Sequence, residues 1–118
     1  MAAAKKPEEA RFLAAAGVKG QYKSFLRDWP EISSTIETFN EYKRVIPANR
    51  LPTAMKDHAL KGVFKGIREC HLADDVLLLY THRKNEIRML YICEHADLYG
   101  RRGRRLAKDV LELDEALL

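Results

Sequence analysis

The 118-residue chain carries 21 Lys and Arg against 17 Asp and Glu, and its pI is about 9.1. This length holds one domain with a single modest core. The basic charge favours a nucleic acid or an acidic partner. No apolar run approaches the roughly 18 residues that span a bilayer, and the first residues carry charges where a secretory signal has its apolar segment. We therefore expect a cytoplasmic protein that makes no membrane contact.

The first half of the chain predicts helices. Residues 1–10 are mostly small or charged and are expected to form a flexible leader, and residues 11–18 are a candidate first strand. Apolar residues at helical spacing over 21–28 predict a helix, which the Trp29-Pro30 pair ends because the residue before a proline is pushed away from the α region. A second helix follows to about Val45, so the two helices form an antiparallel hairpin.

The second half changes to the period of strands. Val63–His71 is strand-like, although Gly62 and Gly66 loosen it. Val76–His82 is a continuous apolar run, which is typical of a central strand covered on both faces. Glu86–Cys93 alternates in polarity. The connections between these segments are short, so the pattern predicts an antiparallel meander.

The last segment, residues 101–118, predicts a basic and amphipathic helix that begins in an arginine-rich run. The fold class is therefore α+β: an N-terminal helical hairpin packed on a small antiparallel meander sheet, with an extra C-terminal helix. Residues 11–100 form the main domain. The side chains expected in the core are Phe25, Ile32, Ile36, Phe39, Leu77, Leu79 and Leu90.

Three histidines and an aspartate surround the predicted strands and suit the cleavage of RNA by acid and base. A base removes the proton of the 2′-hydroxyl, an acid protonates the leaving 5′-oxygen, and cations stabilise the transition state. Histidine serves the first two tasks because its ordinary pKa is about 6.5, and arginine and lysine serve the third. The candidates are His58, His71, Asp75, His95, Lys65 and Arg68. Because His71 and Asp75 flank one tight turn, we expect them to be neighbours.

Simpler explanations compete with this interpretation. His82 lies beside Arg83 in a turn and is expected to be solvated. The histidines and cysteines lack the close pairs typical of zinc sites, so we expect no metal and no cofactor. Cys70 and Cys93 are too few for a disulfide framework and are interpreted as reduced core residues.

Residues 57–100 resemble the YafQ branch of the RelE-like toxins of type II toxin–antitoxin systems. The positions that match the family pattern are Asp57-His58-Ala59-Leu60-Lys61-Gly62, Phe64, Gly66, Arg68-Glu69-Cys70-His71, Asp75, Leu77, Tyr80 and His95-Ala96-Asp97-Leu98-Tyr99.

The resemblance implies a role for each matching polar residue. His95 is the expected general acid, and Asp75 is the expected base or the carboxylate that orients it. His58 and His71 are expected to bind the scissile phosphate, and Tyr99 to stack on a base. The implied RNA-binding set is Lys65, Arg68, Tyr91, Tyr99, Arg101 and Arg102.

Two positions depart from the family pattern. Val76 stands where the family has a tryptophan, and Tyr91 stands where it has an arginine thought to stabilise the transition state. Arg88 lies on the opposite face of an ideal strand from Tyr91, so it could replace that arginine only through a β-bulge. Otherwise the cation comes from Arg68, Lys65 or the arginine run over 101–105.

The resemblance thus implies a ribosome-dependent toxin that cleaves mRNA without a metal and is neutralised by a cognate antitoxin. Operator DNA is an expected partner only through the antitoxin. The alternative is a RelE-fold toxin without nuclease activity, either a gyrase-type poison or a degenerate relative that binds only its antitoxin; Tyr91 favours this alternative. A small DNA-binding protein is a third class, but the chain has no helix-turn-helix pattern.

Overall fold

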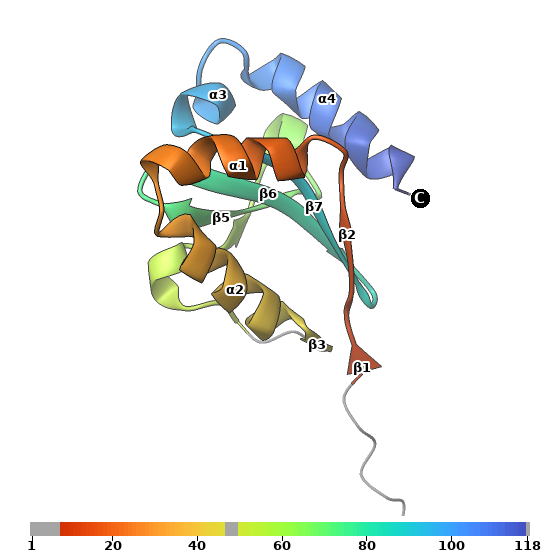
Figure 1. The fold of residues 1–118 in the computed structure, drawn as a ribbon. Coiled ribbons are helices and arrows are strands. Elements are labelled where there is room, and N and C mark those ends of the chain that lie inside the picture. Colours follow the sequence, from red (N-terminus) through yellow and green to blue (C-terminus); the bar gives the residue numbers. More distant parts are fainter. Residues whose placement is uncertain (1–7, 47–49, 118) are drawn as a thin grey trace, which may run out of the picture.

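A computed structural model describes residues 8–46 and 50–117 and shows a sheet with helices on both faces (Figure 1). The five-stranded sheet has the order β2-β7-β6-β5-β4. Its strands are β2 (Arg11–Ala14), β4 (His58–Ala59), β5 (Arg68–Ala73), β6 (Val76–Arg83) and β7 (Glu86–Cys93). The helices are α1 (Val18–Asp28), α2 (Ile32–Lys43), α3 (His95–Tyr99) and α4 (Gly103–Ala116), with short 3₁₀ turns η1 (Thr53–Met55) and η2 (Gly62–Phe64).

The expected leader lies mostly outside the described residues. At its end, β1 (Glu8–Glu9) pairs antiparallel with β3 (Val45–Ile46) in a separate two-stranded ribbon. None of the helices in the described part of the chain is long and apolar enough to cross a membrane.

The strand β6 is central and is buried from both sides. Leu78 and Tyr80 point into a core formed with α1 and α2, where the Phe39 ring meets the Tyr80 ring edge-on at 5.0 Å. Leu77 and Leu79 point into a second core formed with η2, α3 and α4. This confirms the sequence prediction for the run 76–82, because side chains on both faces of a strand must be apolar when both faces are covered.

Most of the expected core is buried, and two of its members are not fully enclosed. Ile32, Phe39, Leu77, Leu79 and Leu90 are buried. The side chains of Phe25 and Ile36 are only partly buried and pack against the edge of the core from α1 and α2. The fold class is the one predicted, and the C-terminal helix turns out to form one wall of a core.

Three local predictions were wrong. The strand expected over 63–71 begins only at Arg68, because Gly62 and Gly66 have φ of +65° and +94° and make a tight turn instead. The first strand ends at Ala14, and α1 begins at Val18, earlier than expected. The sheet is mixed and not purely antiparallel, because β2 pairs parallel with β7.

A β-bulge at Leu90 changes which side chains of β7 share a face. The register pairs Leu79 with Tyr91 and Tyr80 with Met89, so Leu90 is the extra residue. Before the bulge Arg88 points toward α4, and after it Tyr91 packs on the same side. The simple alternation expected over 86–93 is therefore wrong, and Arg88 does share a face with Tyr91.

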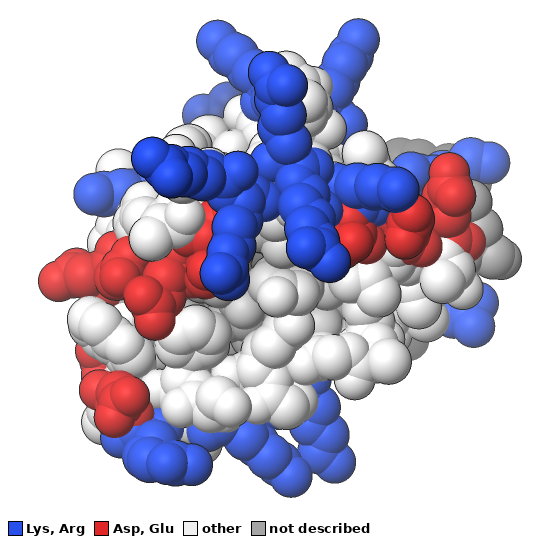
Figure 2. Space-filling model, turned by 90° about the horizontal axis from the view of Figure 1, so that it is seen from above, with Lys and Arg blue, Asp and Glu red and all other residues white. Residues whose placement is uncertain are grey.

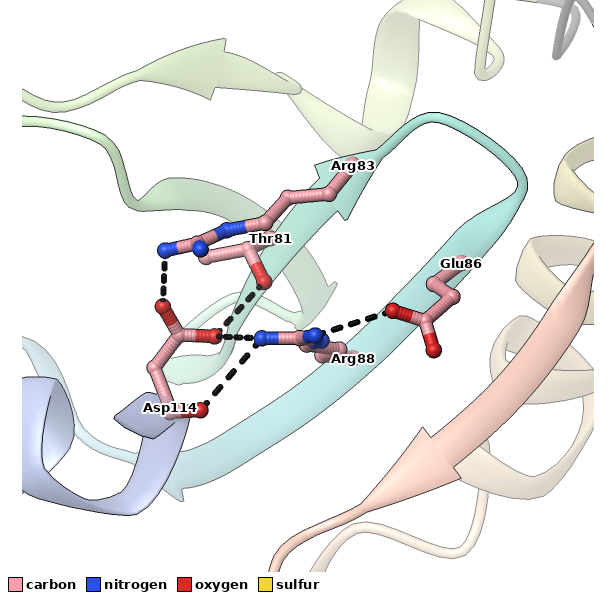
Figure 3. Close-up of polar contacts among 5 residues, drawn as sticks. All are labelled: Thr81, Arg83, Glu86, Arg88 and Asp114. Carbon is pink, nitrogen blue, oxygen red and sulfur yellow. Dashed lines mark hydrogen bonds and ion pairs between the residues drawn. The ribbon is translucent and has the colours of Figure 1, made fainter. Parts of the chain in front are cut away.

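Arg88 is nevertheless not available at the surface, because Asp114 on α4 holds its guanidinium in the interior (Figure 3). Arg88 is 3% exposed and Asp114 is 2% exposed. The Nη1 of Arg88 lies 3.1 Å from Oδ1 of Asp114, and its Nη2 lies 2.9 Å from a carboxylate oxygen of Glu86. Asp114 also accepts hydrogen bonds from Thr81 and Arg83 on β6. This network fastens α4 to the sheet.

We predict that Asp114→Ala lowers the free energy of unfolding by about 3 kcal/mol, because removing one partner of a buried ion pair leaves the other charge unpaired. Urea denaturation measures this change. Glu115→Ala is the matched control, since Glu115 is exposed on the same helix and surface changes usually stay within about 0.5 kcal/mol. Equal stability of the two variants would contradict the prediction.

Candidate active site

A buried carboxylate, Glu69, stands at the centre of a polar cluster. Glu69 and His71 lie two residues apart on β5, so their side chains share the face of the sheet opposite α1 and α2. The Glu69 side chain is only 1% exposed. One of its oxygens accepts a hydrogen bond of 2.8 Å from the Tyr99 hydroxyl, and the other lies 3.5 Å from Nε2 of His71. Nε2 of His58 lies 3.8 Å from the Glu69 oxygen that Tyr99 contacts. Such partners are needed, because burying an unpaired carboxylate is costly.

A second carboxylate, Asp75, pairs with His95. Asp75 lies in the turn between β5 and β6, and His95 opens α3 directly after β7. Oδ1 of Asp75 lies 2.8 Å from Nδ1 of His95. The same oxygen accepts a hydrogen bond of 3.0 Å from the backbone N–H of His95. These backbone and side-chain bonds lower the pKa of Asp75, so the carboxylate is ionised. An imidazole that donates from Nδ1 presents Nε2 to a substrate.

The two histidines of these pairs face each other. The rings of His71 and His95 have their centroids 5.0 Å apart. Burial lowers the pKa of His71; the charge of Glu69 opposes that effect and the neighbouring His95 adds to it. His71 is therefore biased toward its neutral form, which is the form that accepts a proton.

Tyr99 completes the cluster on the other side of His95. Its ring stacks on His95 at 6.0 Å with an angle of 23° between the planes. Burial and the hydrogen bond to Glu69 raise the pKa of Tyr99 to about 12, so the hydroxyl remains a donor at neutral pH. Tyr99 is nevertheless 62% exposed, so its side chain is available to a ligand.

The structure thus brings together His58, His71, Asp75, His95 and Tyr99, all proposed from the sequence. The tight turn had suggested that Asp75 would pair with His71. In the structure Asp75 pairs with His95 instead. Glu69 was missed as a functional residue. Its signal was an acidic residue inside a strand and in phase with His71, but its hydrogen-bond donor Tyr99 lies thirty residues away along the chain.

The other predicted RNA-binding residues lie elsewhere. Arg68 points to the opposite face of the sheet from Glu69 and donates to Asp57 and Tyr80. Tyr91 lines a separate hollow with Arg102. Lys65 and Arg101 are exposed, the first after η2 and the second between α3 and α4. None of these residues has a direct hydrogen bond or ion pair with Glu69 or His95 within the described ranges 8–46 and 50–117.

Cations gather on the side of the molecule that carries α1, α3 and α4 (Figure 2). The exposed basic residues of these elements and their connections are Lys19, Lys23, Arg27, Arg101, Arg102, Arg104, Arg105 and Lys108. Phosphate groups bind such surfaces without regard to sequence.

The same cluster can also present ligands to a metal. One donor atom each from Glu69, His71 and His95 lie within 4.8 Å of one another. Imidazole and carboxylate donors suit divalent transition metals. The spacing rule used on the sequence could not detect this set, because its members come from β5 and α3.

Comparison with known proteins agrees with the geometry. A family model described as bacterial toxin of type II toxin–antitoxin system, YafQ, matches residues 19–100. The mRNA interferase toxin YafQ of Escherichia coli is 38% identical over 50 residues, which are 42% of this chain and 54% of that protein. The matches therefore span between about half and two thirds of the length of the curated relatives.

Solved structures share the fold. The E. coli DinJ–YafQ toxin–antitoxin complex aligns with a TM-score of 0.63 at 22% identity and covers 78% of this chain and 99% of the other. A metal-bound toxin from Helicobacter pylori aligns with a TM-score of 0.57 at 22% identity and covers 75% of this chain and 98% of the other.

We predict that His71 titrates below the ordinary histidine pKa of about 6.5 and that Glu69→Gln lowers its pKa further, because the charge of Glu69 raises it. NMR of the ring Cε1–H resonance against pH measures both values. Glu112→Gln, which neutralises an exposed acid on α4, should leave the His71 titration unchanged. A higher pKa in Glu69→Gln would refute the proposed pairing.

Proposed function

Because the chain belongs to the family of YafQ toxins of bacterial type II toxin–antitoxin systems, we propose that it is an endoribonuclease that cleaves mRNA by acid and base catalysis, without a metal. We further propose that it acts on translating ribosomes in the cytoplasm and that a cognate antitoxin neutralises it. The name of the E. coli relative supports the activity, and the structure of the DinJ–YafQ complex supports the partner. Operator DNA is then contacted only through the antitoxin.

Two carboxylate–histidine contacts carry this proposal, one between Glu69 and His71 and one between Asp75 and His95. The ring centroids of the two histidines lie 5.0 Å apart. A carboxylate behind an imidazole fixes its tautomer and stabilises its protonated form. Two such units on opposite sides of one phosphate supply a base and an acid. Because the two histidines have different surroundings, one can act as the base and the other as the acid.

In the proposed reaction His71 is the base. It takes the proton of the 2′-hydroxyl while Glu69 stabilises the imidazolium that forms. The 2′-oxygen attacks the phosphorus, and the bond from phosphorus to the 5′-oxygen breaks. His95, held by Asp75, donates its proton to that oxygen. The products are a 2′,3′-cyclic phosphate and a 5′-hydroxyl. Asp75 thus orients the acid and does not itself act as base.

His58 and Tyr99 bind the substrate in this proposal. Nδ1 of His58 lies 2.8 Å from the carbonyl oxygen of Lys56, so it donates there and leaves Nε2 near Glu69 and the phosphate. Tyr99 is fixed by Glu69 and His95 and offers an exposed ring on which a splayed base can stack.

One observation favours the alternative of a toxin that binds its antitoxin and lacks nuclease activity. Tyr91 carries no charge, and the nearby Arg88 is held in the interior by Asp114 and Glu86. The transition state then lacks the arginine that the family resemblance implies. The two functions make opposite predictions for the same assay.

We predict that the purified chain cuts mRNA in a translating extract and that His95→Ala abolishes the cuts, because an acid in this position contributes typically 10²–10⁴-fold in rate. EDTA should not reduce cleavage. Primer extension on the message measures the cuts, and His82→Ala is the matched control, since His82 is exposed on β6 away from the cluster. Cleavage that persists in His95→Ala would remove His95 as the acid.

We also predict that Tyr91→Arg increases the cleavage rate, because it adds a cation on the sheet face that carries Glu69. Single-turnover rates of cleavage on ribosomes measure the effect. Tyr91→Lys tests whether charge alone suffices, since lysine lacks the planar fork of arginine. If neither wild type nor Tyr91→Arg cleaves in any ribosomal assay, the binding-only toxin is the better interpretation.

A further inference from the structure

A groove opens between η2 and the start of α4, directly beside His58 and Tyr99. It has a volume of about 510 Å³, within the range of roughly 300–1,000 Å³ that is usual for small-ligand sites. Leu60, Val63, Phe64 and Leu98 line it with apolar surface. The groove therefore continues the candidate active site beyond His58 and Tyr99.

The exposure of apolar side chains at this groove is unusual for a surface. Val63 is 53% exposed and Tyr99 is 62% exposed. They are two of the four large hydrophobic side chains that are exposed among residues 8–46 and 50–117, and both line this groove. Apolar side chains that are exposed next to one another mark binding surfaces, whereas single exposed apolar residues are ordinary.

Two cations stand at the same groove. Lys61 and Arg104 line it and are exposed. In the part of the chain that the structure describes, neither forms a salt bridge. An apolar surface bordered by unpaired cations is complementary to a nucleotide, which has a flat apolar base and an anionic phosphate.

The helix α4 supplies part of this groove. The family match ends at residue 100, and Gly103 and Arg104 lie beyond it. A Cβ at Gly103 would lie 2.5 Å from the carbonyl oxygen of Leu98, so only glycine lets α4 begin this close to α3. The close approach brings the first turn of α4, and with it Arg104, to the groove.

We infer that the η2–α4 groove binds the nucleotide adjacent to the scissile phosphate of a single-stranded RNA. The base lies on the surface formed by Val63, Phe64 and Tyr99, and the backbone phosphate lies toward Lys61 and Arg104. This inference rests on the proposed function, since the scissile phosphate is the one placed between His71 and His95. The groove therefore contributes to the choice of sequence at one position beside the cut.

The test uses a short fluorescein-labelled RNA of mixed sequence with 2′-O-methyl groups, which the 2′-hydroxyl chemistry cannot cleave. Fluorescence anisotropy gives its affinity for the full chain over a range of salt concentrations. Arg104→Ala should reduce the slope of log affinity against log salt by about 0.7, the value for one phosphate contact on a single strand. Val63→Asp should weaken binding about fivefold, because it places an anion against the base.

Arg44→Ala is the matched control. Arg44 is exposed at the end of α2, on the other face of the sheet and outside the cationic side described above, and its loss changes the net charge by the same amount as Arg104→Ala. Circular dichroism confirms that each variant is folded. The inference is overturned if Arg104→Ala and Val63→Asp bind like wild type, or if Arg44→Ala reduces the salt slope equally.

Cleavage assays separate this inference from the proposed function. If wild type cuts mRNA in a manner that needs His95, while the groove variants bind and cut like wild type, the groove is refuted and the nuclease stands. If neither wild type nor any variant cuts mRNA but the differences in RNA affinity are observed, the nuclease activity is refuted and RNA binding at the groove is supported. A changed base preference at one position beside the cut in Val63→Asp supports both.

Discussion

The burial of β6 on both faces is the constraint on which the rest of the structure depends. Successive side chains of a strand point in opposite directions, so its apolar run can leave water only if both faces of the sheet are covered. α1 and α2 cover one face, and η2, α3 and α4 cover the other. The polar cluster lies beside this double cover, on neighbouring β5, in the turn before β6 and at the start of α3. There His71, Asp75 and His95 keep access to solvent, while Glu69 is enclosed.

The two carboxylates show how position controls chemistry in this cluster. Glu69 is enclosed and shares its oxygens among a hydroxyl and two imidazoles, whereas the Asp75 side chain is 45% exposed and contacts His95. The buried setting favours a neutral His71, whereas the His95 side chain is 40% exposed and keeps contact with solvent. Similar residue types thereby acquire different properties from their surroundings.

The sequence predicted what local patterns determine. The run 76–82 and the alternation over 86–93 indicated β6 and β7, and the flanking histidines indicated where the polar cluster of the candidate site lies. The prediction was wrong wherever distant residues decide. The parallel pairing of β2 with β7 and the hydrogen bond from Tyr99 to Glu69 each join segments far apart in the chain, and the bulge at Leu90 depends on how β7 pairs with β6. The strand expected from Val63 was wrong for a local reason, since Gly66 adopts a φ that extended strands exclude.

The ion pair between Arg88 and Asp114 has a consequence for any shortening of this chain. A chain that ended at Gly100 would retain every residue of the polar cluster, yet it would leave the buried Arg88 guanidinium with Glu86 as its one remaining carboxylate partner among the described residues, and it would uncover part of the core around Leu77, Leu79 and Leu90. Such a fragment would be prone to aggregate, since contiguous apolar surface drives self-association. Within this structure α4 therefore belongs to the same folding unit as the sheet, because both the charge on β7 and the second core depend on it.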